Sequence, residues 1–185
     1  MRLIILTEEL SMEVTLKELL PKLGLTNDDF QIISFEGASD LESSLVRRLR
    51  GWRDPQARFL ILRDNDRGDC RHRKKRLEDL VENSGNQRPT KIRIVVQELE
   101  AWFLGDLLAL EQGGFLAGRK RPASLRVNPE MHEKPVEVLK KLDRTYQKTI
   151  GAKRIAPHLS LSDNECRSFH AMVEAVKELM ELNGA

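Results

Sequence analysis

The sequence predicts an α/β protein with a doubly wound parallel sheet of about four strands, flanked by helices, and with a C-terminal helical extension. Three observations predict this fold. Short apolar runs alternate four times with amphipathic helical patterns. The runs contain almost no polar alternation, which is typical of parallel strands buried on both faces. Each run is followed by acidic residues, which places those acids at strand ends.

The four repeating units define the expected elements in order. We expect strands at residues 3–7, 31–35, 59–62 and 92–96, and helices at residues 12–23, 41–49, 70–81 and 101–110. The apolar residues of each helix recur with helical spacing, as at Leu16, Leu19, Leu20 and Leu23. This spacing gives each helix one face with which to cover the sheet.

The sequence changes character after these four units. Residues 1–112 are predicted to form the α/β core, and residues 113–134, rich in Gly, Pro and Arg, an irregular surface excursion. Residues 135–185 are predicted to be a helical part packed on that core, so that the chain is a single domain. Ser162, followed three residues later by Glu165, is typical of a capping box and predicts the start of the last helix.

Bulk composition excludes several classes of protein. The chain has 185 residues and a formal net charge of +2, so charge alone gives no argument for nucleic-acid binding. Its apolar runs are too short to cross a membrane, and its N-terminus has no signal-peptide pattern. Two cysteines, Cys70 and Cys166, form neither a disulfide framework nor a zinc site. We therefore expect a cytoplasmic protein with reduced thiols and no membrane association.

Acidic residues at strand ends are the feature that predicts chemistry. Ligands of open parallel sheets bind beyond the C-terminal ends of the strands. Asp64 and Asp66 follow the third strand, with Asp69 in the same turn, while Glu8 and Glu9 end the first strand, which lies beside the third in a doubly wound sheet. Crowded carboxylates repel one another unless a cation lies among them. Hard oxygen ligands suit Mg²⁺ or Mn²⁺ rather than zinc.

The other two strands also end in acids. Glu36 follows the second strand, and Glu98 and Glu100 follow the fourth, so all three are expected to surround the metal site. Each acid has a structural alternative: an aspartate such as Asp69 caps helices well, and glutamates at a helix N-terminus are favoured by the helix dipole. Trp102, just after Glu100, is expected in the core.

A basic run follows the aspartates. Arg71, Arg73, Lys74 and Lys75 are predicted to contact nucleic-acid phosphates beside the metal; the alternative is the solvated face of an amphipathic helix. Further basic residues would widen such a surface: Arg47, Arg48, Arg50, Arg53 and Arg119-Lys120-Arg121.

Two resemblances add to this reading. Glu9 with Glu13 four positions on, and then Asp64-x-Asp66, resembles the Toprim domain of topoisomerases, primases and overcoming-lysogenization-defect nucleases. Four segments resemble the Toprim-like domain-of-unknown-function family 4276: ILTEELSMEVTLKELLPKL, LILRDNDRGDC, VVQELEAWFLGD and IAPHLSLSDNECRSF. The resemblance touches most of the chain, and ELEAWFLGD is its most specific piece.

The resemblance implies a four-stranded Toprim core in which the first strand's glutamate serves as metal ligand or general acid/base and the aspartate pair holds Mg²⁺. It also implies ATPase partners in bacterial anti-phage gene neighbourhoods. Toprim domains usually carry Glu-Gly here, whereas Leu10 follows Glu9, and the literal pattern is Glu36-Gly37. We prefer Glu9, because the Toprim arrangement places an additional strand and helix before the aspartate pair; Glu8 and Glu9 remain alternatives.

The leading hypothesis is therefore a Mg²⁺-dependent nuclease or related phosphotransfer enzyme. Asp64 and Asp66 would hold metal, and Glu9 or Glu8 would hold a second ion or move a proton. The alternative is a catalytically degenerate binding subunit that docks an ATPase or nucleic acid. A phosphoacceptor receiver domain is disfavoured, because no apolar strand precedes Lys134-Pro135. The sequence pattern is compatible with DNA and with RNA as the nucleic acid, and it does not define the oligomeric state.

Overall fold

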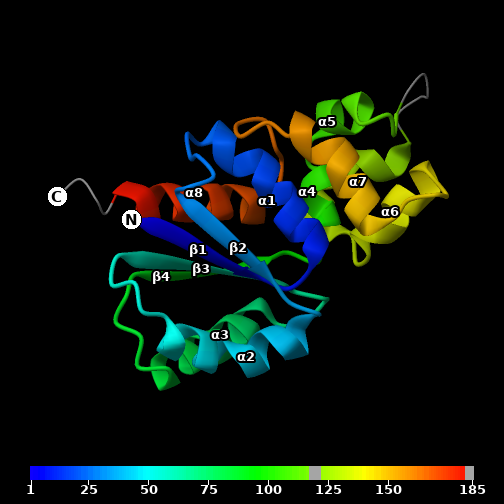
Figure 1. Ribbon diagram of the computed structural model, residues 1–185. Coiled ribbons are helices and arrows are strands. Elements are labelled where there is room, and N and C mark those ends of the chain that lie inside the picture. The colour runs from blue at the N-terminus through cyan, green and yellow to red at the C-terminus, as the bar shows by residue number, and fades with distance from the viewer. Residues whose placement is uncertain (117–121, 182–185) are drawn as a thin grey trace.

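The computed structural model describes residues 1–116 and 122–181, and its centre is one parallel sheet (Figure 1). The strands are β1 (Arg2–Thr7), β2 (Phe30–Ser34), β3 (Ala57–Asp64) and β4 (Thr90–Val95). All three pairings are parallel, and the order is β2-β1-β3-β4. The first and third strands are therefore neighbours, and the predicted doubly wound α/β fold is confirmed.

The strand register brings the acidic strand ends to one edge of the sheet. Thr7 pairs with Leu62, so β1 ends two residues before β3 does at Asp64. Asp64 pairs in turn with Val95, the last residue of β4. The residues that follow these three strands consequently leave the sheet at the same edge.

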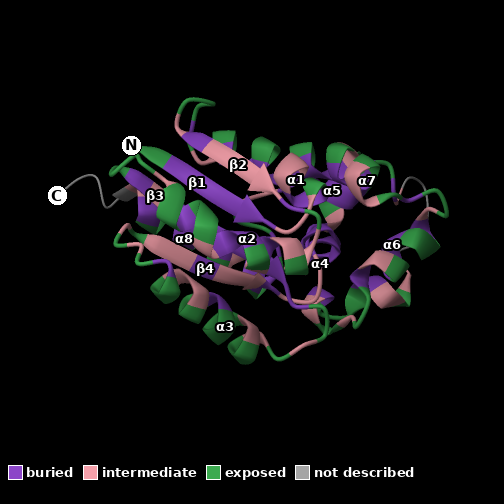
Figure 2. Cartoon of the chain, turned by 60° about the horizontal axis from the view of Figure 1, so that its bottom comes forward, coloured by how far each residue is buried: buried purple, intermediate pink, exposed green. Residues whose placement is uncertain are grey.

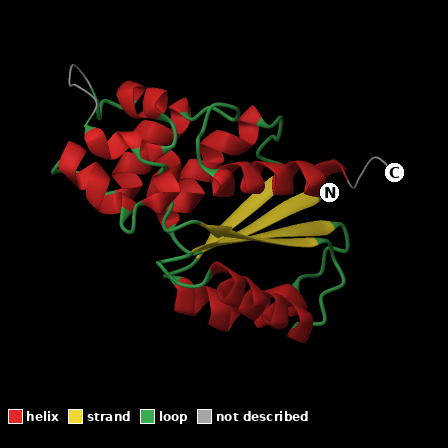
Figure 3. Cartoon of the chain, turned by 180° about the vertical axis from the view of Figure 1, so that it is seen from behind, coloured by secondary structure: helices red, strands yellow, loops and turns green. Residues whose placement is uncertain are grey.

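Helices cover both faces of the sheet, as Figures 1 and 3 show. The helices α2 (Ala38–Gly51) and α3 (Cys70–Asn83) lie on one face, and α1 (Leu10–Lys22) and α8 (Arg167–Glu181) lie on the other. Successive strand residues alternate between the two cores: Ile4 and Ile61 pack toward α2 and α3, and Leu3 and Leu60 toward α1 and α8. Burial on both sides explains why β1 and the middle of β3 are continuously apolar, whereas the edge strands β2 and β4 are largely of intermediate burial (Figure 2).

A further group of helices lies beyond the C-terminal ends of the strands. It consists of α4 (Glu100–Leu104), α5 (Leu107–Gln112), α6 (Pro135–Leu142) and α7 (Lys148–Ile155), with the 3-10 helices η1 (Ala123–Arg126), η2 (Pro129–Met131) and η3 (Ala156–His158). Its core is continuous with the core of α1 and α8. Trp102 is completely buried there, and its Nε1 donates to Ser168 Oγ at 3.0 Å.

Several helix boundaries differ from the prediction. The last helix begins at Arg167 rather than at Ser162, which lies in a turn with Ser160. The helix expected at residues 101–110 is divided into α4 and α5 around Gly105, where a side chain would collide with Asn164 Oδ1 at 2.4 Å. The helix α7 lies within residues 135–185, which are predicted to be helical, but the sequence pattern does not define its bounds.

Two further points concern the limits of the described chain. The basic run Arg119-Lys120-Arg121, within the predicted excursion, lies outside the described residues. In residues 1–116 and 122–181, no helix combines the length and the apolar character that crossing a membrane requires.

Candidate carboxylate and lysine site

Asp64 and Glu9 form the start of the candidate site. Asp64 ends β3 and is 4% exposed, with its side chain on the face that α1 and α8 cover. Glu9 lies between β1 and α1, where its Oε1 accepts a hydrogen bond from Ser11 Oγ at 3.0 Å. The two carboxylates lie close enough for the charge of Glu9 to raise the pKa of Asp64.

Lys148 is the cation of this site. It is the first residue of α7, and its Nζ donates to both carboxylate oxygens of Glu9, at 2.9 and 3.1 Å, although 139 residues separate the two in sequence. Burial opposes the charge of Lys148, but the carboxylates of Glu100 and Glu9 outweigh it and raise the pKa of the ammonium group. Lys148 is therefore charged throughout the physiological range.

Glu100 brings a third carboxylate from the fourth strand's exit. It begins α4 and is completely buried, and its Oε1 accepts a hydrogen bond from Tyr146 Oη at 2.9 Å. Its Oε2 is buried without a hydrogen-bond partner among the described residues. Burial raises the pKa of Glu100 to about 7, although the charge of Lys148 opposes the shift.

Asp64 lies at the centre of these charges. Burial raises its pKa well above the usual range, and the charges of Glu9, Glu8 and Glu100 raise it further, while Lys148 lowers it. One ammonium group thus faces three carboxylates. The three carboxylates together can carry more negative charge than Lys148 compensates, and a bound cation would compensate the remainder.

Glu8 and Asp66 form a second, more exposed part of the site. Glu8 Oε2 accepts a hydrogen bond from the backbone N–H of Asp64 at 3.3 Å. Burial and the charge of Asp66 raise the pKa of Glu8. The charge of Arg63 opposes this shift of the Glu8 pKa in part.

The loop that carries Asp66 has an unusual backbone. Asp66 and Arg67 have φ values of 45° and 61°, and Gln97, in the loop after β4, has a φ of 58°. The two loops are joined by hydrogen bonds from the backbone N–H of Asp66 to Gln97 O and from that of Arg67 to Gln97 Oε1, both at 3.0 Å. Left-handed non-glycine residues cluster at functional sites.

The structure places the other predicted acids outside this cluster. The Oδ1 of Asp69 caps α3 by accepting from the backbone N–H groups of Arg71 and His72, which is the alternative the sequence left open. Glu36 is exposed beyond the edge strand β2. Glu98 instead accepts from the backbone N–H of Val136 at the start of α6.

The predicted phosphate-binding run is partly neutralised by its own helix. Lys74 pairs with Glu78 at 3.8 Å and Lys75 with Asp79 at 2.9 Å, one turn on in α3. Arg73 folds back over the loop at Gly68 instead. Arg71 is exposed. The solvated-face alternative therefore describes Lys74 and Lys75.

The carboxylate oxygens of the cluster suit a hard divalent cation, but they do not surround a single point at which an ion could bind. Its free acceptors are carboxylate oxygens, and Glu100 Oε2 is a buried acceptor without a partner. Among the residues that the structure describes, no three acidic, histidine or cysteine side chains are placed to hold an ion as they stand. Lys148 lies against Glu9, so binding of an ion requires this pair to separate or shift.

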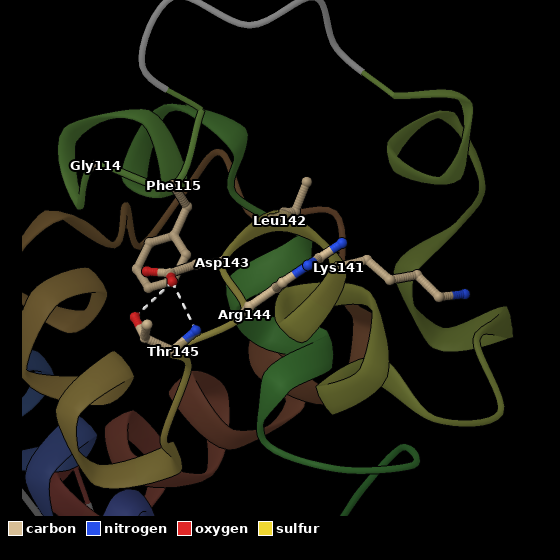
Figure 4. A pocket seen from close by; sticks show the side chains of 7 residues that line it. All are labelled: Gly114, Phe115, Lys141, Leu142, Asp143, Arg144 and Thr145. Atoms are coloured by element: carbon tan, nitrogen blue, oxygen red, sulfur yellow. Dashed lines mark hydrogen bonds between the residues drawn. The ribbon is translucent and has the colours of Figure 1, made fainter.

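A cavity of about 650 Å³ lies away from the carboxylate and lysine site, among the helices beyond the C-terminal ends of the strands (Figure 4). It is lined by Gly114, Phe115, Lys141, Leu142, Asp143, Arg144 and Thr145. Asp143 Oδ1 accepts hydrogen bonds there from the backbone N–H and the hydroxyl of Thr145, at 2.9 and 2.6 Å. None of the predicted site residues lines this cavity, and the candidate site rests on the strand ends instead.

Comparison with known proteins identifies the family. A family model described as Domain of unknown function (DUF4276) matches residues 7–177. The chain belongs to the DUF4276 family. The matched region of this DUF4276 chain contains every residue of the carboxylate and lysine site. No match was found among curated proteins.

A solved structure shares the fold of the DUF4276 chain. It is the C-terminal region of the OLD protein of Xanthomonas campestris pv. campestris, with a TM-score of 0.59 and 17% sequence identity. The similarity covers 99% of this chain and 97% of that one. At this identity the likeness concerns the fold, and the DUF4276 chain accordingly has a Toprim-like α/β fold.

Proposed function

We propose that this DUF4276 domain binds Mg²⁺ or Mn²⁺ at its carboxylates and hydrolyses nucleic-acid phosphodiesters. The observation that carries the proposal is convergence: Glu9, Asp64 and Glu100 leave three different strands and meet around one lysine. The fold shared with the OLD protein and the sequence resemblance to Toprim domains of nucleases support it.

Each residue has a role in this proposal. Asp64, Glu9 and Glu100 would hold the ion in the buried part of the site, and Asp66 would hold it from the exposed part. A divalent ion in such a site polarises the phosphate and lowers the pKa of bound water. Lys148 Nζ donates a hydrogen bond to a phosphate oxygen and stabilises the negative charge that develops there. Glu8, whose pKa is raised, accepts a proton at its carboxylate.

The test is a pair of isosteric substitutions. Asp64→Asn removes a charge from the buried centre of the cluster and is expected to abolish Mn²⁺-dependent cleavage of a labelled oligonucleotide, with the circular dichroism spectrum unchanged. Asp69→Asn removes the same charge from a helix cap that asparagine fills equally well, and is expected to retain cleavage. Cleavage by the Asp64 variant at the wild-type rate would refute the assignment of Asp64.

A second function is favoured by one observation. Lys148 already pairs with Glu9, and no set of three ligands is preformed within the described residues. A non-catalytic subunit that docks an ATPase, as the family resemblance to anti-phage systems implies, or nucleic acid would need neither metal nor turnover. It predicts no binding heat when Mn²⁺ is titrated in a calorimeter, whereas the metal-dependent enzyme predicts saturable heat that Asp64→Asn removes.

A further inference from the structure

A groove lies at the other end of the sheet from the carboxylates. It has a volume of about 420 Å³ and is lined by Arg47, Arg48, Gly51 and Trp52, at the C-terminal end of α2. The helix α2 begins beyond the C-terminal end of β2 and runs back along the sheet for 14 residues, roughly 20 Å. The groove is therefore about one helix length from the acidic site.

The arginines of this groove carry uncompensated charge. Arg47 and Arg48 are exposed and form no ion pair with any residue in the described ranges, and no acid lines the groove. The helix dipole favours basic residues in the last turn, which contains Arg48 and Arg50, but Arg47 precedes that turn. The contrast with α3, where Glu78 and Asp79 neutralise the lysines, indicates a surface suited to an anion.

The floor of the groove is rigidly held. Arg88 donates from Nη2 to Trp52 O at 2.6 Å and from Nε to Asp54 O at 2.8 Å. The half-buried indole of Trp52 packs edge-on against Phe59, with ring centroids 5.7 Å apart. These contacts fix the backbone of the turn after α2 and the indole of Trp52, so the aromatic ring is presented without a large ordering cost.

We propose that Arg47, Arg48 and Trp52 form a second contact for a nucleic-acid strand, remote from the carboxylate site. Guanidinium groups bind phosphate oxygens in pairs, and an indole stacks a base. The identity of the strand rests on the proposed function, because the strand that binds here is the one whose phosphodiester reaches Asp64. A strand that spans both ends must cover roughly 20 Å, or about six nucleotides at a rise of 3.4 Å.

Tryptophan fluorescence provides a direct reading of this contact. The chain contains two tryptophans, and Trp102 is completely buried, so quenching by a ligand reports on Trp52. We would titrate the protein with a 20-nucleotide single-stranded DNA in the presence of EDTA, where no metal-dependent cleavage takes place. Quenching is expected for the 20-mer and much weaker binding for a trinucleotide, which is too short to span both sites.

A matched pair of double variants tests the residues. Replacing Arg47 and Arg48 by Ala is expected to weaken binding about tenfold or more at low salt, and to reduce the slope of log K against log salt by about 1.4, which corresponds to two phosphate contacts on a single strand. Replacing Lys74 and Lys75 by Ala removes the same charge from α3 and is expected to change binding less than twofold. Equal weakening by both pairs, or an unquenched Trp52, would overturn the proposal, as would failure to bind DNA at all.

A test of the groove can be distinguished from a test of the proposed nuclease activity. Mn²⁺-dependent hydrolysis of bis(p-nitrophenyl) phosphate, which is too small to reach the groove, is expected to be unchanged when Arg47 and Arg48 are replaced. If the wild-type protein binds the 20-mer through the groove but hydrolyses neither substrate, the groove stands and the nuclease proposal fails. If an acidic protein quenches Trp52 and DNA does not, the nucleic-acid assignment of the groove is wrong.

Discussion

The two parts of the carboxylate site differ in how their charge and backbone are held. In the buried part, Asp64 ends a central strand, Glu100 begins a helix, and the ammonium group of Lys148 compensates their charge in part. In the exposed part, Asp66 stands on a left-handed loop. The buried part thus has a regular backbone and closely spaced charges, and the exposed part has a strained backbone and, at Asp66, an exposed side chain.

This difference separates two tasks that a metal site must perform. Buried acids in excess of their counter-ion bind a cation strongly, because binding removes repulsion that the fold already contains. An exposed acid on a loop held by hydrogen bonds instead orients its carboxylate toward the ion, because its backbone is fixed before any ligand binds. Substitutions that remove what is particular to each part therefore distinguish the two tasks.

The largest effect is expected from the pH dependence of Glu100. Its folded-state pKa of about 7 lies above the unfolded value of 4.5, so the folded state binds more protons between these limits. Stability should therefore fall as pH rises from about 4.5 to 7, by up to about 3 kcal/mol. Glu100→Gln should remove the share of this slope that is due to Glu100 in urea unfolding with EDTA, and leave the share due to Asp64. A slope that Glu100→Gln does not alter would show that Glu100 is ionised without penalty.

Removal of the counter-ion is expected to have the next largest effect. Lys148→Met leaves Glu9, Asp64 and Glu100 without their cation and should destabilise the protein by about 2 kcal/mol at pH 8, a value reduced for the partial exposure of Lys148. The loss should shrink at pH 5, where Asp64 and Glu100, whose pKa values are raised, bind protons. Lys153→Met, on the same helix and exposed, is the control and should change stability little.

The Lys148 variant also tests whether a metal can replace the ammonium group. Added Mn²⁺ should restore stability to Lys148→Met more than to the wild type, because only the variant has lost its cation. Equal stabilisation of both proteins by Mn²⁺ would place the ion away from Lys148.

The site residues that follow predicted strands could be identified from the sequence, whereas Lys148, which lies in a helix far along the chain, could not. Alternating apolar runs identified the four strands, and the doubly wound arrangement predicted that the first and third are neighbours, which brings Glu9 toward Asp64. Lys148 was missed because α7 (KTIGAKRI) has little apolar periodicity, and because nothing local connects it with Glu9, 139 residues away.

The sequence alone did not distinguish the roles of neighbouring acidic residues. Glu98 and Glu100 are two positions apart, yet one caps α6 and the other is buried in the site. Both follow the turn at Gln97, whose left-handed conformation has no signature in a non-glycine residue. Asp69 was different: a capping role was already visible in its place before a helix, and that is the role the structure shows.

The smallest effect, and one of opposite sign, is expected in the exposed part. Arg67 has a φ of 61° and an exposed side chain, so Arg67→Gly relieves backbone strain and should stabilise the protein by about 0.5–1 kcal/mol in urea unfolding. Lys75→Gly, within the regular helix α3, is the control and should destabilise it by about 1 kcal/mol. If both substitutions destabilise alike, the loop after β3 carries no strain. The exposed part would then differ from the buried part in solvation alone.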